Sequence, residues 1–383
     1  MPRTRRLLAV LAAAIVLTTT ACSAPAEPAP TRTAAERSTA SPTPSPTPTD
    51  PAVDAVQRMS TAQQAATVVM GHIPTADPSA LRKYMSAGLG GFILMGSNVP
   101  ATPEQLRTVT QALVVDDALP PLIAVDQEGG DVSRLGWDEL PAGRTLKSRP
   151  AAETRAAFTA RGKLLADTGI TVNFGIVADI PRDASSFIHR RALGTDPAAS
   201  AERVTAAVQA EAPFVASTLK HFPGHGAAPG DSHHGIPSTA ETLEQWRNSD
   251  ALPFVAGIEA GAPVLMFGHL AYTAVDSAPA SLSARWHQIA RDELGFDGVV
   301  ITDDLGMLGS SGVDVYRDPV RNAVTALTAG SDMVLMIAGS TPDTAGQMVD
   351  GIVRAVADGT LPAERLQEAA ERVVRLRMQL ATR

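Results

Sequence analysis

Half of the chain's eight histidines lie within sixteen residues, 220–235. This stretch reads KHFPGHG over residues 220–226 and DSHHG over residues 231–235. No apolar repeat of two or 3.6 residues runs through it, so the pattern predicts a loop, delivered by the apolar run that precedes it. A loop rich in imidazole groups can bind a metal, form a structural turn or transfer protons.

The spacing of the side chains favours proton transfer. Asp231 stands two residues before His233, and a carboxylate at that spacing can fix the imidazole tautomer and raise its basicity. His221 and His225 would have the spacing of paired metal ligands only in a helix, which Pro223 and Gly224 oppose. A metal site and a structural turn remain alternatives, but we expect no metal and no cofactor.

The elements that position this loop alternate regularly along the chain. Eight short apolar runs read as strands, at residues 67–71, 91–95, 122–126, 172–176, 213–219, 264–267, 298–301 and 332–336. Helical periodicity occupies residues 79–86, 103–115, 151–168, 197–211, 243–260, 283–294, 319–329 and 345–357, with a further helix at 364–380. Eight strand and helix repeats predict a single (β/α)8 TIM-like barrel.

Ligands of such barrels bind beyond the C-terminal ends of the strands. Polar residues follow several of the predicted strands directly: Asp126, the histidine-rich loop, His269 with Tyr272, and Asp303 with Asp304. One of the two adjacent aspartates should project at the mouth while its neighbour packs or caps the next helix, although both could cap. A carboxylate facing an Asp–His pair is what a double displacement at a sugar carbon requires.

Together these motifs resemble those of family 3 glycoside hydrolases, in particular the bacterial β-N-acetylglucosaminidases that trim cell-wall fragments. The resemblance is carried, in order, by residues 126–130 (DQEGG) with Arg134, by residues 220–226, by Asp231-Ser-His233 and by residues 302–307 (TDDLGM). It extends from about Met59 to the last helix. It implies that Asp303 is the nucleophile and that His233 is the general acid/base, oriented by Asp231.

The resemblance also implies a set of sugar-binding residues, namely Asp126, Arg134, Arg191, Lys220 and His221. Arg191 is matched through Ile188-His-Arg-Arg-Ala-Leu-Gly194, in which His189 and Leu193 replace the glycine and phenylalanine usual in the family. Further departures are Asp131, where the family has arginine, and Ala227-Ala228, where it has Asp-Thr. None of them replaces a proposed catalytic group.

The N-terminus has the pattern of an export signal. Three arginines precede an apolar run at residues 7–17 that is too short to span a bilayer as a helix. Cys22, the only cysteine, follows in a segment that resembles a lipobox, although Thr19 stands where that motif usually has an aliphatic residue. We therefore expect a signal peptide at residues 1–21 and lipidation of Cys22, with ordinary secretory cleavage as the alternative.

Residues 22–51 should form a disordered tether and residues 52–383 the catalytic domain. Residues 23–51 contain eight prolines and no valine, isoleucine, leucine, methionine or aromatic residue, so they cannot build a core. Removal of the three signal arginines takes the formal charge from −8 to −11. So acidic a domain is a poor candidate for binding nucleic acid, and we expect none.

Taken together, the sequence predicts a retaining exo-β-N-acetylglucosaminidase. Its expected substrate is a GlcNAc-containing muropeptide or cell-wall saccharide. Its expected state is a monomer held by a lipid anchor on the outer face of the cell membrane, or secreted. Within the family, a phosphorylase or a β-glucosidase is the alternative activity. The phosphorylase is an alternative because a neutral imidazole left after proton transfer repels phosphate less than a carboxylate would. A sugar-binding lipoprotein without catalysis is the alternative from another class.

Overall fold

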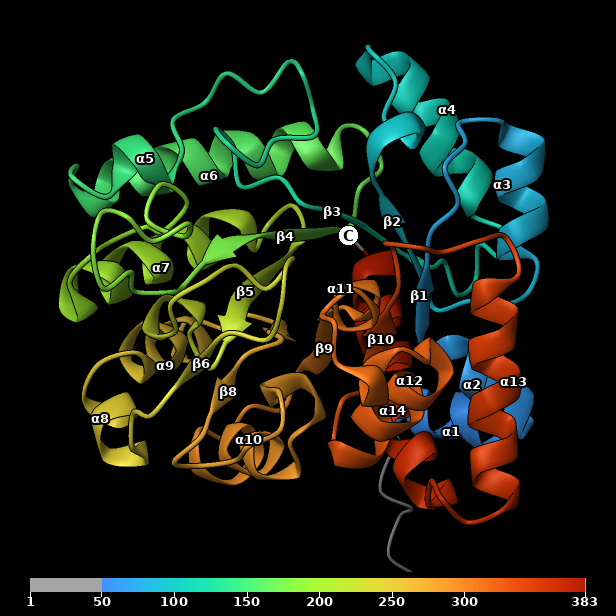
Figure 1. Cartoon of the computed structure of the whole chain (residues 1–383). Coiled ribbons are helices and arrows are strands. Elements are labelled where there is room, and N and C mark those ends of the chain that lie inside the picture. The colour runs from blue at the N-terminus through green and yellow to red at the C-terminus, as the bar shows by residue number, and fades with distance from the viewer. Residues whose placement is uncertain (1–49, 383) are drawn as a thin grey trace, which may run out of the picture. The chain divides into compact units, whose positions relative to one another are not determined.

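Eight parallel strands close into a barrel in the computed structural model, which describes residues 50–382 (Figure 1). Each barrel strand pairs with the barrel strands that come before and after it in the sequence, and the last strand pairs with the first. The strands are β1 (Val69–Gly71), β2 (Gly91–Leu94), β3 (Leu122–Val125), β4 (Val172–Val177), β5 (Ala216–Phe222), β7 (Val264–Phe267), β9 (Val299–Asp304) and β10 (Met333–Leu335). The predicted barrel is confirmed, whereas the predicted signal peptide, Cys22 and most of the predicted tether lie outside the described residues.

The predicted helices occur between the strands in the expected order, whereas the helices at residues 51–57, 61–67, 143–146 and 305–309 were not predicted. The described α-helices are α1 (Pro51–Gln57), α2 (Thr61–Thr67), α3 (Pro78–Met85), α4 (Pro103–Leu113), α5 (Gly143–Leu146), α6 (Ala151–Ala166), α7 (Pro197–Glu211), α8 (Leu243–Asn248), α9 (Ala251–Glu259), α10 (Ala284–Gln288), α11 (Leu305–Gly309), α12 (Pro319–Ala329), α13 (Thr344–Ala357) and α14 (Ala363–Ala381). Among the described residues, no helix combines the length and the apolar character needed to cross a bilayer.

Five of the described helices begin with the same local signal. Asp50, Asp77, Thr102, Asp196 and Asp318 each precede a proline, and each side chain accepts a hydrogen bond from a backbone N–H in the first turn. The cap oxygen satisfies an otherwise unpaired N–H, and proline fits the first helical position because it lacks one. These starts are therefore encoded locally.

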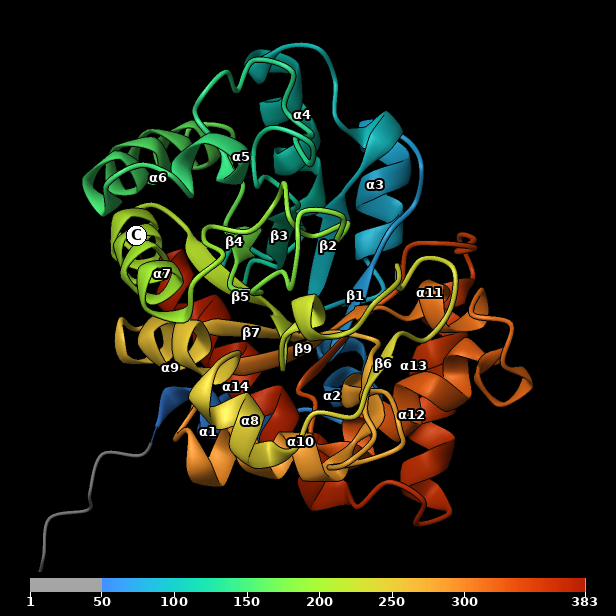
Figure 2. The same ribbon diagram turned by 60° about the vertical axis from the view of Figure 1, so that its left-hand side comes forward.

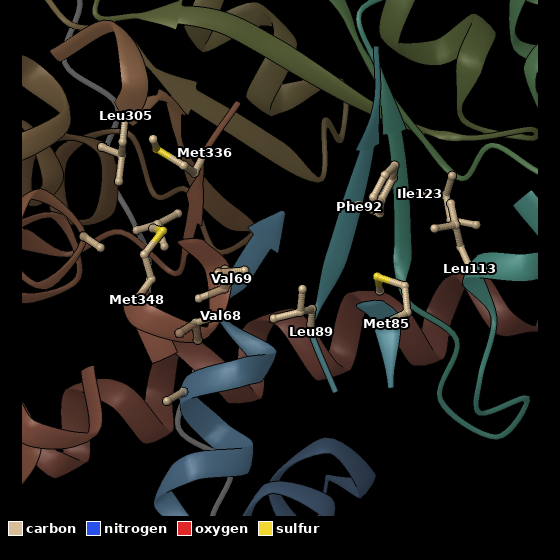
Figure 3. Close-up of a cluster of buried hydrophobic side chains, with 14 of the residues drawn as sticks. Val68, Val69, Met85, Leu89, Phe92, Leu113, Ile123, Leu305, Met336 and Met348 are labelled. Carbon is tan, nitrogen blue, oxygen red and sulfur yellow. The ribbon is translucent and has the colours of Figure 1, made fainter. Parts of the chain in front are cut away.

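Alternating residues divide each strand between two cores. In β2, Ile93 faces the barrel interior, where the apolar cluster includes Met70, Phe174 and Met266. The adjacent Phe92 belongs to the outer cluster, which packs strands against the surrounding helices (Figure 3). Side chains of α14, including Val373 and Leu376, join the interior cluster. The barrel is thus packed as a core, which leaves the carboxyl ends of the strands for chemistry.

Two local predictions were wrong. The helix expected at residues 243–260 is broken into α8 and α9 at Ser249 and Asp250. Asp250 is buried there and binds the guanidinium of Arg182, 2.5 Å away, a long-range contact that helical periodicity cannot reveal. The strand expected at 213–219 starts at Ala216 and continues to Phe222, so the first three residues of the KHFPGHG segment are strand rather than loop.

Candidate active site

Charged side chains gather where β3, β4, β5 and β9 end. Asp126 follows β3 immediately, Asp179 comes two residues after β4, and Lys220 and Asp303 lie near the ends of β5 and β9. Because the strands are parallel, these ends meet on one face of the barrel, as Figure 2 shows for the strands themselves. The common rim predicted from the sequence is therefore present.

Lys220 is the centre of this cluster. Its Nζ lies 2.8 Å from Asp126 Oδ1 and 2.8 Å from Glu128 Oε1, although the side chain is almost fully buried. Burial opposes its charge, but the two carboxylates outweigh burial and raise the pKa of Lys220. Arg134 Nη2 lies 3.6 Å from the other oxygen of Asp126. Asp126 is therefore held between two cations.

Glu128 holds a second cation in place. Arg191 donates to both of its carboxylate oxygens, from Nε at 2.9 Å and from Nη2 at 2.7 Å. Burial would favour the neutral acid, but Lys220 and Arg191 lower the pKa of Glu128 to about 2. A carboxylate that stays ionised cannot act as a general acid, so Glu128 orients Lys220 and Arg191.

His221 is locked in one tautomer. Its Nε2 lies 3.4 Å from Arg191 Nη2, and its Nδ1 lies 2.7 Å from Asp179 Oδ2. A guanidinium can only donate, so Nε2 accepts and Nδ1 carries the proton. Burial and the charge of Arg191 lower the pKa of His221 well below its usual value, which keeps the ring neutral.

Asp179 was missed from the sequence. Its Oδ1 accepts hydrogen bonds from the backbone N–H groups of His221, at 3.2 Å, and His225, at 2.6 Å. The sequence could have indicated Asp179, because it lies just past the predicted fourth strand. The other rim residues were found by the rule that polar residues after a strand lie at the ligand-binding end of the barrel. Asp179 fixes both the backbone and the ring of His221.

The two adjacent aspartates point to different environments. Asp304 caps α11 through the N–H of Gly306 and also accepts from the N–H groups of Ile337 and Ala338. Burial raises the pKa of Asp304 to about 6. Asp303 is only partly buried and accepts the N–H of Asp304 at 2.8 Å. The predicted division of the pair, with one member capping the next helix, is confirmed.

Asp303 is held ionised by its surroundings. Burial acts to raise its pKa, but the hydrogen bond from the N–H of Asp304 and the charge of Lys220 help to lower the pKa of Asp303 below its usual value. His269 also fixes the neighbouring backbone, since its Nε2 lies 2.9 Å from the carbonyl oxygen of Asp304. An ionised carboxylate among hydrogen-bonding groups at a barrel mouth is equipped to act as a nucleophile.

Asp231 and His233 form a pair on the loop between β5 and β6 (Ser238–Thr239). His233 Nδ1 lies 2.5 Å from Asp231 Oδ1, and the His233 side chain is 58% exposed. Within residues 50–382, neither side chain hydrogen-bonds to the buried cluster around Lys220. The structure thus forms the predicted pair and leaves it on the exposed part of its loop.

That loop is fixed at both of its bases. Tyr272, in β8 (Ala271–Tyr272), donates to the carbonyl oxygen of Gly224 at 2.9 Å, and Trp246 donates to that of Pro223 at 2.8 Å. After the loop, β6 pairs with β8, and Ile236 packs against the apolar cluster that contains Leu305 of α11. The loop therefore extends towards α11, the helix that follows Asp303 (Figure 2).

The predicted site residues thus fall into two groups. The buried group consists of residues joined by direct contacts or by their charges, namely Asp126, Arg134, Arg191, Lys220, His221 and Asp303. The second group is the pair on the loop, Asp231 and His233. The first can bind a polyhydroxylated ligand and supply a nucleophile, and the second can transfer a proton at the same end of the barrel.

Comparison with known proteins assigns this arrangement to a family. Residues 64–376 match the glycosyl hydrolase family 3 N terminal domain. A β-hexosaminidase of Pseudomonas aeruginosa is 40% identical over 258 residues, which cover 65% of this chain and 75% of the relative.

Solved structures show the same similarity. A family 3 β-N-acetylglucosaminidase from Paenibacillus matches with a TM-score of 0.77 and 30% identity, over 84% of this chain and 63% of that one. The chain therefore spans less than two thirds of the Paenibacillus protein. A family 3 member from Mycobacterium smegmatis matches with a TM-score of 0.74 and 28% identity, over 84% and 98% of the two chains.

Proposed function

Since the chain belongs to glycosyl hydrolase family 3 and is a glycoside hydrolase of the β-N-acetylhexosaminidase type, we propose that it is a retaining exo-β-N-acetylglucosaminidase acting on peptidoglycan-derived saccharides. The observation that carries this proposal is the state of Asp303. Its carboxylate at the barrel mouth accepts the N–H of Asp304 at 2.8 Å and is favoured in its ionised form by the charge of Lys220, while Asp304 is engaged in capping.

The reaction proceeds in two displacements. Asp303 attacks the anomeric carbon, the glycosidic C–O bond breaks, and the departing oxygen takes a proton from the protonated imidazole of His233. His233 then removes a proton from water, the resulting hydroxide attacks the same carbon, and the bond to Asp303 breaks. Asp231 orients the ring through Nδ1, leaving Nε2 free for proton transfer. For this, the exposed loop must approach the bound sugar.

The buried cluster supports exo action. Lys220 and Asp126 are held together deep in the site, and Arg134 and Arg191 complete a set of groups that can hydrogen-bond to sugar hydroxyls. Groups fixed at the closed end of a site bind a terminal sugar more readily than the middle of a chain. Cleavage then releases one residue at a time from the non-reducing end.

Product analysis tests the proposal. Incubation with a GlcNAc–MurNAc-peptide should release free GlcNAc with the β configuration at first, detected by NMR, both with and without phosphate. The Asp303→Asn variant should lose activity on an aryl β-GlcNAc by at least about a thousandfold. Asp183→Asn is the control, because this exposed carboxylate accepts from the backbone N–H and the hydroxyl of its near neighbour Ser185. Full activity of Asp303→Asn, or formation of GlcNAc 1-phosphate, would contradict the proposal.

We also propose that the enzyme works outside the cytoplasm, anchored through Cys22. Support comes from the three arginines and the apolar run before that cysteine. Metabolic labelling with a fatty-acid analogue should mark the wild-type protein and not Cys22→Ser. Labelling of both proteins, or of neither, would contradict the anchor.

A further inference from the structure

His225 is a buried imidazole whose hydrogen-bonding groups are unused. Its side chain is almost inaccessible, and within residues 50–382 neither ring nitrogen has a hydrogen-bond partner. A buried polar group without a partner destabilises the fold, and such groups are rare. Such a group beside a candidate active site calls for a ligand atom to satisfy it.

The imidazole ring of His225 is not needed to hold the loop in place. The backbone N–H of His225 braces the turn by donating to Asp179 Oδ1 at 2.6 Å. Any residue other than proline could make this backbone contact. The imidazole itself is therefore available for another purpose.

The ring lies inside the site. Its centroid is 6.0 Å from that of His221, and it meets the edge of Phe187 with the centroids 4.6 Å apart. The guanidinium of Arg191 lies over the same Phe187 ring, 5.8 Å from its centroid. The charge of Asp303 also acts on His225. His225 and Phe187 thus form a wall beside His221, within reach of the charge of Asp303.

The chemistry of this wall differs from that of the hydroxyl-binding groups. Lys220, Arg191 and Asp126 carry full charges, whereas burial lowers the pKa of His225 and keeps the ring neutral. A neutral imidazole offers one N–H donor and one acceptor, and the phenyl ring beside it offers an apolar surface. An acetamido group has the complementary set, namely a carbonyl oxygen, an N–H and a methyl group.

We propose that His225, backed by Phe187, binds the 2-acetamido group of the sugar and thereby makes the enzyme prefer N-acetylhexosaminides to hexosides. C2 of the sugar adjoins the anomeric carbon that Asp303 attacks, so its substituent must lie near the nucleophile. The substrate class in this inference rests on the proposed function.

Two aryl glycosides with the same leaving group test the inference: an aryl β-GlcNAc and the matching aryl β-glucoside. In His225→Ala, kcat/KM for the GlcNAc compound should fall about ten- to a hundredfold, as for the loss of one or two neutral hydrogen bonds. The value for the glucoside should stay within about threefold. His225→Gln keeps a donor and an acceptor and should restore part of the preference, and it is the variant to use should His225→Ala not fold.

His287→Gln is the matched control, since it changes another buried histidine, one that bonds Ser283 and Ser331 away from the site. It should leave the ratio of the two substrates unchanged. Equal losses on both substrates in the His225 variants, or no loss on either, would overturn the inference. Failure of the proposed function has a different signature, because the wild-type enzyme would then prefer the glucoside or would not depend on Asp303.

Discussion

Replacement of Asp179 by asparagine should disable the site without removing any substrate-binding group. The carboxylate accepts three N–H groups: two from the backbone of His221 and His225, and one from His221 Nδ1. An asparagine of the same shape has only one oxygen. It will keep that oxygen facing the two backbone donors, because the opposite rotamer would leave both unpaired.

The amide NH2 of the variant then faces His221 Nδ1, 2.7 Å from the position of the lost oxygen. The neutral ring must accept from it, so its proton moves to Nε2. That N–H points at Arg191 Nη2, 3.4 Å away, which also donates. The repulsion between the two facing donors will push Arg191 away from its bidentate bond with Glu128. Arg191 is one of the side chains expected to bind the sugar, so its displacement disturbs the site.

The magnitude follows from the bonds lost. A hydrogen bond to a charged group contributes about 1.5–3 kcal/mol, which corresponds to roughly a ten- to hundredfold loss in kcat/KM if it is fully expressed in the transition state. The assay is hydrolysis of an aryl β-GlcNAc, with circular dichroism and thermal unfolding to show that the fold is intact. Asp183→Asn, on the same loop but exposed, is the control.

The reasoning would be refuted by a folded Asp179→Asn enzyme whose kcat/KM stays within about twofold of wild type, a change smaller than the loss of one such bond. It would also be refuted by an equal loss in Asp183→Asn. NMR of the His221 ring nitrogens gives an independent check, since the proton should sit on Nδ1 in the wild type and on Nε2 in the variant.

Three further predictions concern other groups. Removal of the acid/base in His233→Ala should reduce activity on natural saccharides about a hundredfold or more, and much less on aryl glycosides with good leaving groups; equal losses on both would exclude the assigned role. Lys220→Met leaves Asp126 and Glu128 without their shared cation, so it should abolish substrate binding and lower the melting temperature by several degrees, as for breaking a buried pair at about 3–5 kcal/mol; unchanged KM and melting temperature would contradict this. Burial raises the pKa of Glu211 from 4.5 to about 8, so at intermediate pH the folded state retains a proton that the unfolded state has lost. The contribution of the protonated Glu211 to stability is therefore complete below pH 4.5 and is lost as the pH rises through 8. Glu211→Gln should therefore match wild type near pH 5 and be more stable near pH 9, by about 5 kcal/mol at most; parallel melting curves against pH would show that Glu211 is not buried in its neutral form.

The sequence determined the features whose signal is local. Apolar runs separated by helical periodicity predict eight strands and their helices, because burial on two faces or on one stripe dictates the spacing of apolar residues. The position of Asp303 directly after such a run places it at the barrel mouth. The Asp231–His233 pair is equally local, since its members are only two positions apart.

The tertiary structure decided which side chains meet. Lys220 reaches Asp126 across 94 positions of the chain, and Asp179 meets His221 across 42. Asp250 breaks a helix through an equally distant partner, Arg182. Such pairs depend on which strands and loops are neighbours in the closed barrel, and periodicity carries no information about these partners.

Ionisation was decided in the same way. The sequence contains adjacent aspartates at 303 and 304 with no difference in chemical type, yet burial raises the pKa of Asp304 while a backbone N–H and the charge of Lys220 help to lower that of Asp303. It contains His225 without any sign that the ring nitrogens lack partners. The charge of a buried group is set by the atoms that replace its water, and only the fold brings those atoms together.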